Sequence, residues 1–183
     1  MIITIAGYPG SGKSTVGKIL AEKLGYNRYS MGDLQRNLAK EHGMTLQEWQ
    51  THEEGDDKYD RELDENQRQL GLNEDNFIVD GRLSWHFIPH SLKIFLNVDP
   101  REGAKRIFDH AKKGDRPNEN PYHSIEQVME QAKARVASEN KRYMDYHGVH
   151  WDDKEKFDLV IDTTNIGPEE VATQIIDKMT ETK

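Results

Sequence analysis

The chain has 183 residues, enough for one domain of ordinary size and hardly enough for two. Charged residues make up 32% of it and the formal net charge is −8, so a nucleic acid polymer, which usually binds a basic surface, is not an expected partner. The absence of cysteine excludes disulfides, thiolate metal sites and cysteine nucleophiles, and no apolar run approaches the ~20 residues that a membrane span needs, so we expect a cytoplasmic protein with no membrane segment.

Short apolar, β-branched runs alternate with longer amphipathic stretches along the chain. The runs predict strands at 2–6, 27–29, 76–80, 92–98 and 158–162. The amphipathic stretches predict helices at 13–24, 31–42, 45–52, 59–70, 101–112, 124–146 and 168–179. Nearly continuous apolar strands are typical of a parallel sheet that is buried on both faces, so the alternation predicts an open α/β fold.

Several of these helices carry start or stop signals. Asp99 precedes a proline and is expected to cap the helix that follows. Ser124 is a candidate N-cap with Gln127 three residues later, which is the spacing of a capping box. Gly25 and Gly148 are expected to end the helices before them.

Two polar segments interrupt the alternation. Residues 43–73 are strongly charged and predict a helical insertion after the second strand, while residues 112–123 contain two prolines and predict a polar loop. Solvated surface is the simplest interpretation of both. The phosphate-binding motif at Gly7–Ser14 weakens that interpretation, because polar segments near a phosphate site can also take part in ligand binding.

The most specific motif is Gly7-Tyr8-Pro9-Gly10-Ser11-Gly12-Lys13-Ser14, a full G-x-x-x-x-G-K-[ST] match between a predicted strand and a predicted helix. Glycines let the backbone wrap so that its N–H groups point at phosphate oxygens, at a helix N-terminus whose dipole favours anions. Lys13 can bridge the β- and γ-phosphates, and the Ser14 hydroxyl can ligate Mg²⁺. The motif therefore predicts a nucleoside triphosphate site.

Arginines follow two other strands. Ser30-Met31-Gly32-Asp33-Leu34-Gln35-Arg36 comes after the second strand, and Asp80-Gly81-Arg82-Leu83 after the third. Both places are carboxyl ends of strands, where open α/β sheets bind their ligands. Arg36 and Arg82 can therefore converge on one acceptor phosphate, although each could instead form an ordinary surface ion pair.

The helix at 124–146 carries a third cluster. Steps of three and four residues place on one stripe Val128, Ala132, Arg135, Glu139, Arg142 and Tyr146. An intrahelical ladder of ion pairs is one interpretation. The other is that Arg135 and Arg142 point into the active cleft while Glu139 orients them, with Arg106 and Arg116 near the polar loop able to close over a transferring phosphoryl group.

Taken in order, the motifs resemble a known family. They are Gly7–Ser14, Ser30-x-Gly32-Asp33-x-x-Arg36, Tyr59-Asp60-Arg61-x-x-Asp64, Val79-Asp80-Gly81-Arg82-Leu83, Arg135-x-x-x-Glu139-x-x-Arg142-Tyr143 and Asp158-Leu-Val-Ile-Asp162-Thr163. Together they resemble the cytidylate kinases, most closely the short archaeal-type and related bacterial cytidylate-kinase-like proteins, over roughly residues 1–180.

The resemblance implies a five-stranded parallel sheet flanked by helices, in a single P-loop kinase domain over residues 1–183. It implies that about 43–73 is a monophosphate-binding region and about 112–123 a lid. The implied reaction transfers the γ-phosphoryl group of ATP to CMP or dCMP, with Mg²⁺, in a monomeric protein.

Carried over motif by motif, the resemblance assigns ATP binding to Gly7, Tyr8, Pro9, Gly10, Ser11, Gly12, Lys13, Ser14, Thr15 and Thr163. It assigns monophosphate binding to Ser30, Gly32, Asp33, Arg36, Arg61, Gly81, Arg82, Arg135, Glu139 and Arg142. It gives catalytic roles to Lys13, Arg106, Arg135 and Arg142, with Arg116 as a further lid candidate. Ser14 would ligate Mg²⁺, with Asp33 and Asp80 holding it through water.

The acceptor base is less closely specified. The Asp-Gly-Arg motif continues as Leu83-Ser84-Trp85-His86, unlike in the larger bacterial cytidylate kinases, and only chemistry and region favour Asp60, Arg61 and Asp64 as residues that recognise cytosine. AMP, UMP or another small molecule is the alternative acceptor. An ATP-hydrolysing switch with a protein partner is the alternative of another class, but such a switch has no acceptor phosphate for Arg135 and Arg142 to hold. Trp49, Trp85 and Trp151 are expected to be packing anchors rather than stacking platforms.

Overall fold

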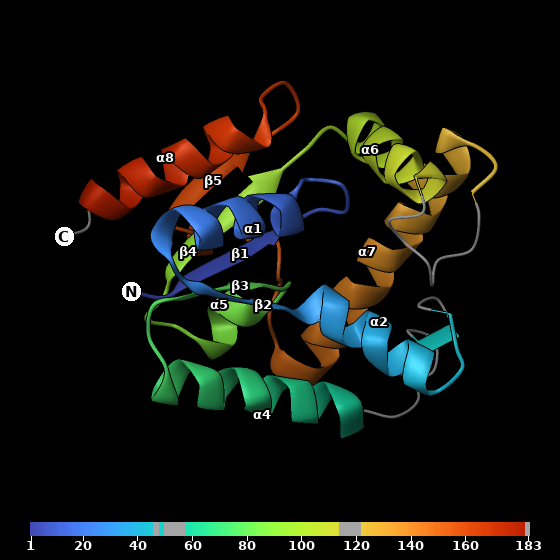
Figure 1. Cartoon of the computed structure of the whole chain (residues 1–183). Coiled ribbons are helices and arrows are strands. Elements are labelled where there is room, and N and C mark those ends of the chain that lie inside the picture. Colours follow the sequence, from blue (N-terminus) through green and yellow to red (C-terminus); the bar gives the residue numbers. More distant parts are fainter. Residues whose placement is uncertain (46–47, 50–57, 114–121, 182–183) are drawn as a thin grey trace.

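In the computed structural model, which describes residues 1–45, 48–49, 58–113 and 122–181, five parallel strands form one sheet in the order β2-β3-β1-β4-β5 (Figure 1). The strands are β1 (Ile3–Gly7), β2 (Asn27–Ser30), β3 (Phe77–Asp80), β4 (Leu92–Asn97) and β5 (Leu159–Asp162). Every predicted strand is present with its ends shifted by one residue at most, which confirms the five-stranded α/β fold.

Helices connect the strands. They are α1 (Lys13–Leu24), α2 (Met31–Glu41), α4 (Lys58–Asn73), α5 (Ser84–Phe87), α6 (Pro100–Lys112), α7 (Ile125–His147), the short 3₁₀ helix η1 (Lys154–Lys156) and α8 (Pro168–Glu181). The sequence analysis missed α5 and η1, because a single turn is too short to produce a helical period. Most of the helix predicted at 45–52 lies outside the described residues.

The predicted helix ends are confirmed. The Ser124 side chain accepts a hydrogen bond from the Gln127 N–H at 3.1 Å, and Asp99 accepts from the first turn of α6. Gly25 and Gly148 both adopt the left-handed conformation, with φ of 65°, which costs little without a Cβ. These caps fix where the helices on either side of the sheet begin and end.

Helices cover both faces of the sheet (Figure 1), and alternate residues of a strand pack against opposite layers. Ile3 and Ile5 pack with Val16 and Leu20 of α1 and with residues of α8. Ala6 and Phe95 pack on the other face with aromatic residues from α5 and from the segment after α7. The central strands β1, β3 and β4 are thus buried on both faces, as their apolar sequences predicted, whereas the edge strands β2 and β5 are partly exposed.

The carboxyl edge of the sheet collects the polar motifs. Gly7 ends β1, Ser30 ends β2 and Asp80 ends β3, while Asp162 ends β5. The connection after β1 leads to β2 on one side of the sheet, and the connection after the neighbouring strand β4 leads to β5 on the other, so a crevice forms between the ends of β1 and β4. Among the described residues, no helix is long and apolar enough to cross a membrane.

Candidate active site

The loop from Gly7 to Ser14 joins β1 to α1 in a tightly wrapped conformation. Gly10 and Gly12 have φ of 76° and 89°, in the left-handed region that favours glycine. A Cβ on Gly10 would lie 2.2 Å from the carbonyl oxygen of Gly103, so the loop also packs directly against α6. Residue 103 must be small as well, because a Cβ there would lie 2.8 Å from the Pro9 carbonyl oxygen.

Lys13 bends back over this loop. Its ammonium donates hydrogen bonds to the carbonyl oxygens of Gly7 at 2.8 Å and Tyr8 at 2.9 Å. Burial, and then the nearby charge of Arg82, lower the pKa of Lys13 well below its ordinary value. A phosphate group beside the ammonium would stabilise its charged form and so oppose the lowering of its pKa. The lysine is therefore placed to interact with an anion.

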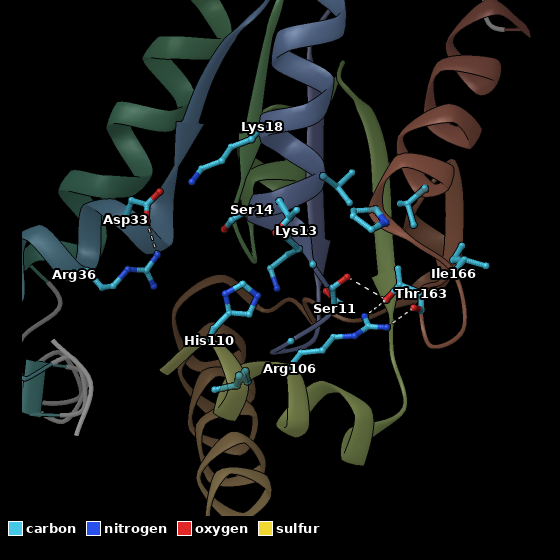
Figure 2. A pocket seen from close by; sticks show the side chains of 17 residues that line it. Ser11, Lys13, Ser14, Lys18, Asp33, Arg36, Arg106, His110, Thr163 and Ile166 are labelled. Carbon is cyan, nitrogen blue, oxygen red and sulfur yellow. Dashed lines mark hydrogen bonds and ion pairs between the residues drawn. The ribbon is translucent and has the colours of Figure 1, made fainter. Parts of the chain in front are cut away.

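A cavity of about 720 Å³ opens beside the loop (Figure 2). It is lined by Gly10, Ser11, Gly12, Lys13, Ser14, Thr15, Val16, Lys18, Asp33, Arg36, Arg106, Ile107, His110, Thr163, Ile166, Pro168 and Val171. The cavity therefore unites seven of the ten predicted ATP-binding residues with Asp33 and Arg36 from the start of α2, which are the only predicted monophosphate residues in its lining among those that the structure describes. Its charged lining is mostly cationic, although the whole chain is acidic.

Tyr8 links the loop to a segment far along the chain. Its hydroxyl donates a hydrogen bond to Asp152 at 3.1 Å, and its ring packs edge-on against Trp151 and Phe95. Burial, followed by the charge of Asp152, raises the pKa of the Tyr8 hydroxyl. The phenol therefore stays protonated and keeps the loop attached to the segment before η1.

Asp80 is held by three donors at the edge of the sheet. Its Oδ1 accepts from the hydroxyls of Ser14 at 3.1 Å and Ser30 at 3.0 Å, and its Oδ2 accepts from Arg28 at 2.6 Å. The sequence analysis missed Arg28, which lies within β2 before the Ser30 motif. Gly17 leaves room for it, since a Cβ there would lie 3.1 Å from the Arg28 Nε.

These oxygens suit Mg²⁺. A hydroxyl and a carboxylate side by side are hard donors of the kind that the ion takes when it keeps several waters and is completed by substrate phosphates. No cluster of three or more histidine, aspartate or glutamate side chains that could hold a metal occurs among the described residues. The donor set therefore fits an ion that arrives with a nucleotide, with Ser14 and Asp80 facing it.

Asp33 and Arg36 form a pair on the first turns of α2. The Asp33 carboxylate accepts a hydrogen bond from Arg36 at 2.5 Å, and Arg28 lies 3.5 Å from its other oxygen. Burial alone would raise the pKa of Asp33, but Arg36 and Arg28 lower it below its ordinary value. Both side chains line the cavity, facing the phosphate loop across it (Figure 2).

Glu139 joins two arginines behind the loop. It accepts from Arg82 at 2.7 Å and from Arg135 at 2.8 Å. Burial opposes its charge, but the two guanidinium groups lower the pKa of Glu139 to about 2. Arg82 also donates to the Gly7 carbonyl oxygen. The predicted intrahelical Arg135–Glu139 pair is thus present, and Glu139 additionally holds Arg82 from the end of β3.

Other predicted site residues lie on α4 and α7. Arg142 is buried on α7, with its Cζ 5.5 Å from the Tyr143 ring centroid, whereas Arg61 is exposed on α4. Asp64 is buried and lies 3.1 Å from the Nε2 of His147. The side chain of Asp60 and all of Arg116 lie outside the described residues.

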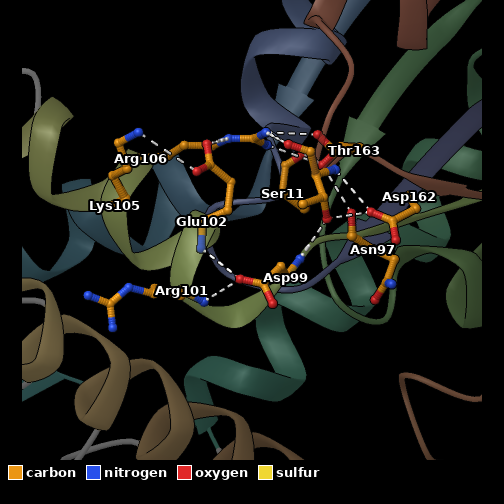
Figure 3. A network of polar contacts seen from close by, with 10 residues as sticks. Ser11, Asn97, Asp99, Arg101, Glu102, Lys105, Arg106, Asp162 and Thr163 are labelled. Carbon is orange, nitrogen blue, oxygen red and sulfur yellow. Dashed lines mark hydrogen bonds and ion pairs between the residues drawn. The ribbon is translucent and has the colours of Figure 1, made fainter.

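Arg106 lies on the opposite side of the cavity from Arg36, in a network of polar contacts (Figure 3). Its guanidinium donates to the Thr163 hydroxyl at 3.2 Å and to the Thr163 and Thr164 carbonyl oxygens at 2.8 and 3.0 Å. The Thr163 hydroxyl in turn lies within hydrogen-bond distance of the carbonyl oxygens of Ser11 at 3.1 Å and Asn97 at 3.0 Å, and can donate its one proton to either. Arg106 and Thr163 therefore brace the phosphate loop from the β5 side.

The cavity has two further residues that the sequence analysis did not assign. Lys18 reaches it from the second turn of α1, and His110 points into it from α6, one turn after Arg106 (Figure 2). A spacing of four residues places His110 on the same helix face as Arg106, which is the signal that could have found it.

Comparisons with known proteins agree with this geometry. A family model described as the cytidylate kinase-like family matches residues 2–165. A cytidylate kinase of Methanosphaera stadtmanae is 37% identical, covering 100% of this chain and 99% of that protein, and one of Methanococcoides burtonii is 38% identical, covering 90% and 88%. Among solved structures, a shikimate kinase from Acinetobacter baumannii in complex with shikimate has a TM-score of 0.61 at 17% identity, covering 100% of this chain and 94% of that one.

Proposed function

Since the chain belongs to the cytidylate kinase-like family, we propose that it transfers the γ-phosphoryl group of ATP to CMP or dCMP, giving ADP and CDP or dCDP. The observation that carries this proposal is the cavity between the phosphate loop and α2. A triphosphate can lie along Lys13 and the loop amides on one side, and an acceptor phosphate can approach Arg36 on the other.

We assign the roles of the cationic residues from the motifs in which they stand. Lys13, Arg36 and Arg106 line the cavity, whereas Arg82 and Arg135 lie beside it, joined by Glu139. Lys13 and the N–H groups of the loop hold the ATP phosphates. Arg36, Arg82, Arg135 and Arg142 bind the acceptor phosphate and the group in transfer, whose charge spreads over its equatorial oxygens. Arg106 and Thr163 support the loop from the β5 side. No covalent intermediate on the protein is needed, because positioning and electrostatic stabilisation supply the catalysis.

Mg²⁺ belongs to the same proposal, with Ser14 as a direct ligand and Asp80 and Asp33 holding its water molecules. When bound, it neutralises charge on the β- and γ-phosphate oxygens. Arg28 fixes Asp80 by one carboxylate oxygen, so that the other oxygen faces Ser14. Arg36 holds one carboxylate oxygen of Asp33 at 2.5 Å, and Arg28 lies 3.5 Å from the other.

The remaining parts of the proposal rest on the sequence. They are a monophosphate-binding region at about 43–73, a lid at about 112–123 that excludes water, and recognition of cytosine by Asp60, Arg61 and Asp64. A cytoplasmic monomer that binds small nucleotides is likewise a prediction, and composition and net charge predict that it binds neither membranes nor nucleic acid polymers.

A coupled assay of ADP release tests the proposal, with MgATP against CMP, dCMP, UMP, AMP and GMP in separate reactions. We expect turnover that depends on an added monophosphate and is fastest with CMP or dCMP. Faster turnover with another monophosphate would keep the mechanism and replace the acceptor. ATP loss that is slow and independent of every acceptor would contradict kinase activity and favour a hydrolysing switch.

A further inference from the structure

Trp151, between α7 and η1, lies against Arg82. Its side chain is fully buried, and the Cζ of Arg82 lies 4.5 Å from the centroid of its ring. The same indole contacts the Tyr8 ring of the phosphate loop at 5.5 Å and stacks on Phe95 of β4 at 6.1 Å. One aromatic residue therefore connects the sheet, the phosphate loop and an arginine of the site.

A tryptophan at position 151 would destabilise the fold more than an apolar side chain if its only role were to fill the core. Its indole N–H is buried and has no hydrogen-bond partner within the described part of the chain. An unpaired buried donor destabilises a fold, and a phenylalanine at this position would fill much of the same space without that donor. A tryptophan ring is, however, the side chain that attracts a cation over its face most strongly. The contact with Arg82 therefore gives Trp151 a role that a phenylalanine would fill less well.

Arg82 is constrained from several directions at once. Its Nε donates to Glu139 at 2.7 Å, its Nη1 donates to the Gly7 carbonyl oxygen, and the indole covers one side of the guanidinium. Only 9% of the side chain is exposed. In the described residues no hydrogen bond uses Nη2, so the remaining edge of the guanidinium is the part that can meet a phosphate oxygen.

We propose that Trp151 is a positioning residue for acceptor binding: its ring holds the Arg82 guanidinium in the orientation that presents it to the phosphate of the acceptor monophosphate. This inference rests on the proposed function, which places Arg82 at that phosphate. A cation held over an aromatic face is fixed in position without a hydrogen bond being used, so its N–H groups remain available to the ligand.

Replacement of Trp151 by phenylalanine and by leucine tests the role. Phenylalanine keeps a weaker aromatic face and leucine keeps none, so we expect the Kd and KM for CMP to rise about 3-fold in Trp151→Phe and about 10- to 30-fold in Trp151→Leu. We expect KM for ATP to stay within about twofold, because Lys13 and the loop amides are unchanged. Titration calorimetry with CMP alone gives Kd independently of turnover.

Trp85 provides a matched control. It is also buried in the same aromatic cluster, and its indole N–H likewise lacks a partner among the described residues. Its ring contacts are with Phe157 at 5.3 Å and His86 at 5.8 Å. Trp85→Phe should therefore leave the Kd for CMP unchanged, while denaturant unfolding of both phenylalanine variants checks that they fold.

The outcomes distinguish the positioning role of Trp151 from the proposed phosphoryl transfer. A graded loss of CMP affinity in the Trp151 variants, absent in Trp85→Phe, supports the positioning role. A folded Trp151→Leu variant with wild-type Kd for CMP would overturn it, and so would an equal rise in KM for ATP, since either result reduces Trp151 to a packing residue. A wild-type chain that neither binds nor phosphorylates any monophosphate would overturn the proposed function itself.

Discussion

Glu139 is the side chain that holds Arg82 and Arg135 in place. It is buried, yet it is ionised between Arg82 and Arg135, and this environment lowers its pKa to about 2. Without the carboxylate, the two guanidinium groups would repel each other at the edge of the core, and Arg82 would lose the partner that orients its Nε.

Glu139→Gln should therefore destabilise the fold in a pH-dependent way. At pH 7 we expect a loss of about 2–3 kcal/mol in the free energy of unfolding, because one partner of a buried ion pair is removed. The folded pKa lies below the ordinary value, so this stabilisation is complete above about pH 4.5 and is lost as the pH falls toward 2. Denaturant unfolding of both proteins at pH 7 and pH 3 should show the difference falling to roughly half. An equal difference at the two pH values would contradict an ionic role.

We expect Lys13 to contribute to phosphoryl transfer at a cost to stability. Its charged form is disfavoured by burial and by Arg82, which lower its pKa. Lys13→Met should lower kcat by about 10²- to 10³-fold, the usual effect of removing one group that stabilises transition-state charge. The free energy of unfolding should fall by no more than about 1 kcal/mol, because an apolar side chain of similar length replaces a buried cation. A strongly unfolded variant would show that the ammonium is needed for the loop itself.

Arg28 and Trp151 show why part of the site could not be predicted from residues taken one at a time. The phosphate loop, Arg36, Arg82 and Glu139 stand in motifs with a recognisable spacing. Arg28 instead reaches Asp80, and Trp151 reaches Arg82, across long stretches of sequence. Such contacts depend on how strands and helices pack, which no local pattern contains.

At the scale of elements, the alternation of apolar runs and amphipathic stretches predicted every strand and all the longer described helices. These elements contain enough residues for their hydrophobic pattern to be recognised in the sequence. It missed α5, a single turn between β3 and β4. The order of strands in the sheet does not follow from periodicity, since it depends on which neighbours cover each apolar face.

The contact between α6 and the phosphate loop gives a test at this scale. A methyl group on Gly103 would lie 2.8 Å from the Pro9 carbonyl oxygen and 3.1 Å from Val98, so α6 would have to move away from the loop. Gly103→Ala should raise KM for ATP about tenfold and cost about 1–3 kcal/mol of stability. Gly167→Ala is the control, because a methyl group there meets no atom within 4 Å. Steady-state kinetics that do not distinguish the two variants would contradict a role for this contact.

At the scale of the whole molecule, nucleotide binding and folding should be coupled. The cavity is lined by residues from α1, α2, α6, α8 and the segment after β5, so a ligand bound there connects elements that are distant in the chain. MgATP at about 100 times its Kd should add about 2.7 kcal/mol to the free energy of unfolding and raise Tm by about 5–10 °C. Thermal unfolding with and without MgATP measures this, with Lys13→Met as the variant expected to show a much smaller shift.

Transfer of a phosphoryl group between two nucleotides is the activity that we propose for this fold. The most direct measurement follows the γ-phosphate of labelled ATP in the presence of Mg²⁺ and CMP. We predict that the label appears in CDP, with little in inorganic phosphate, because the acceptor arginines hold CMP in place of water. Label that appears only in inorganic phosphate, at a rate that CMP does not change, would contradict the claim.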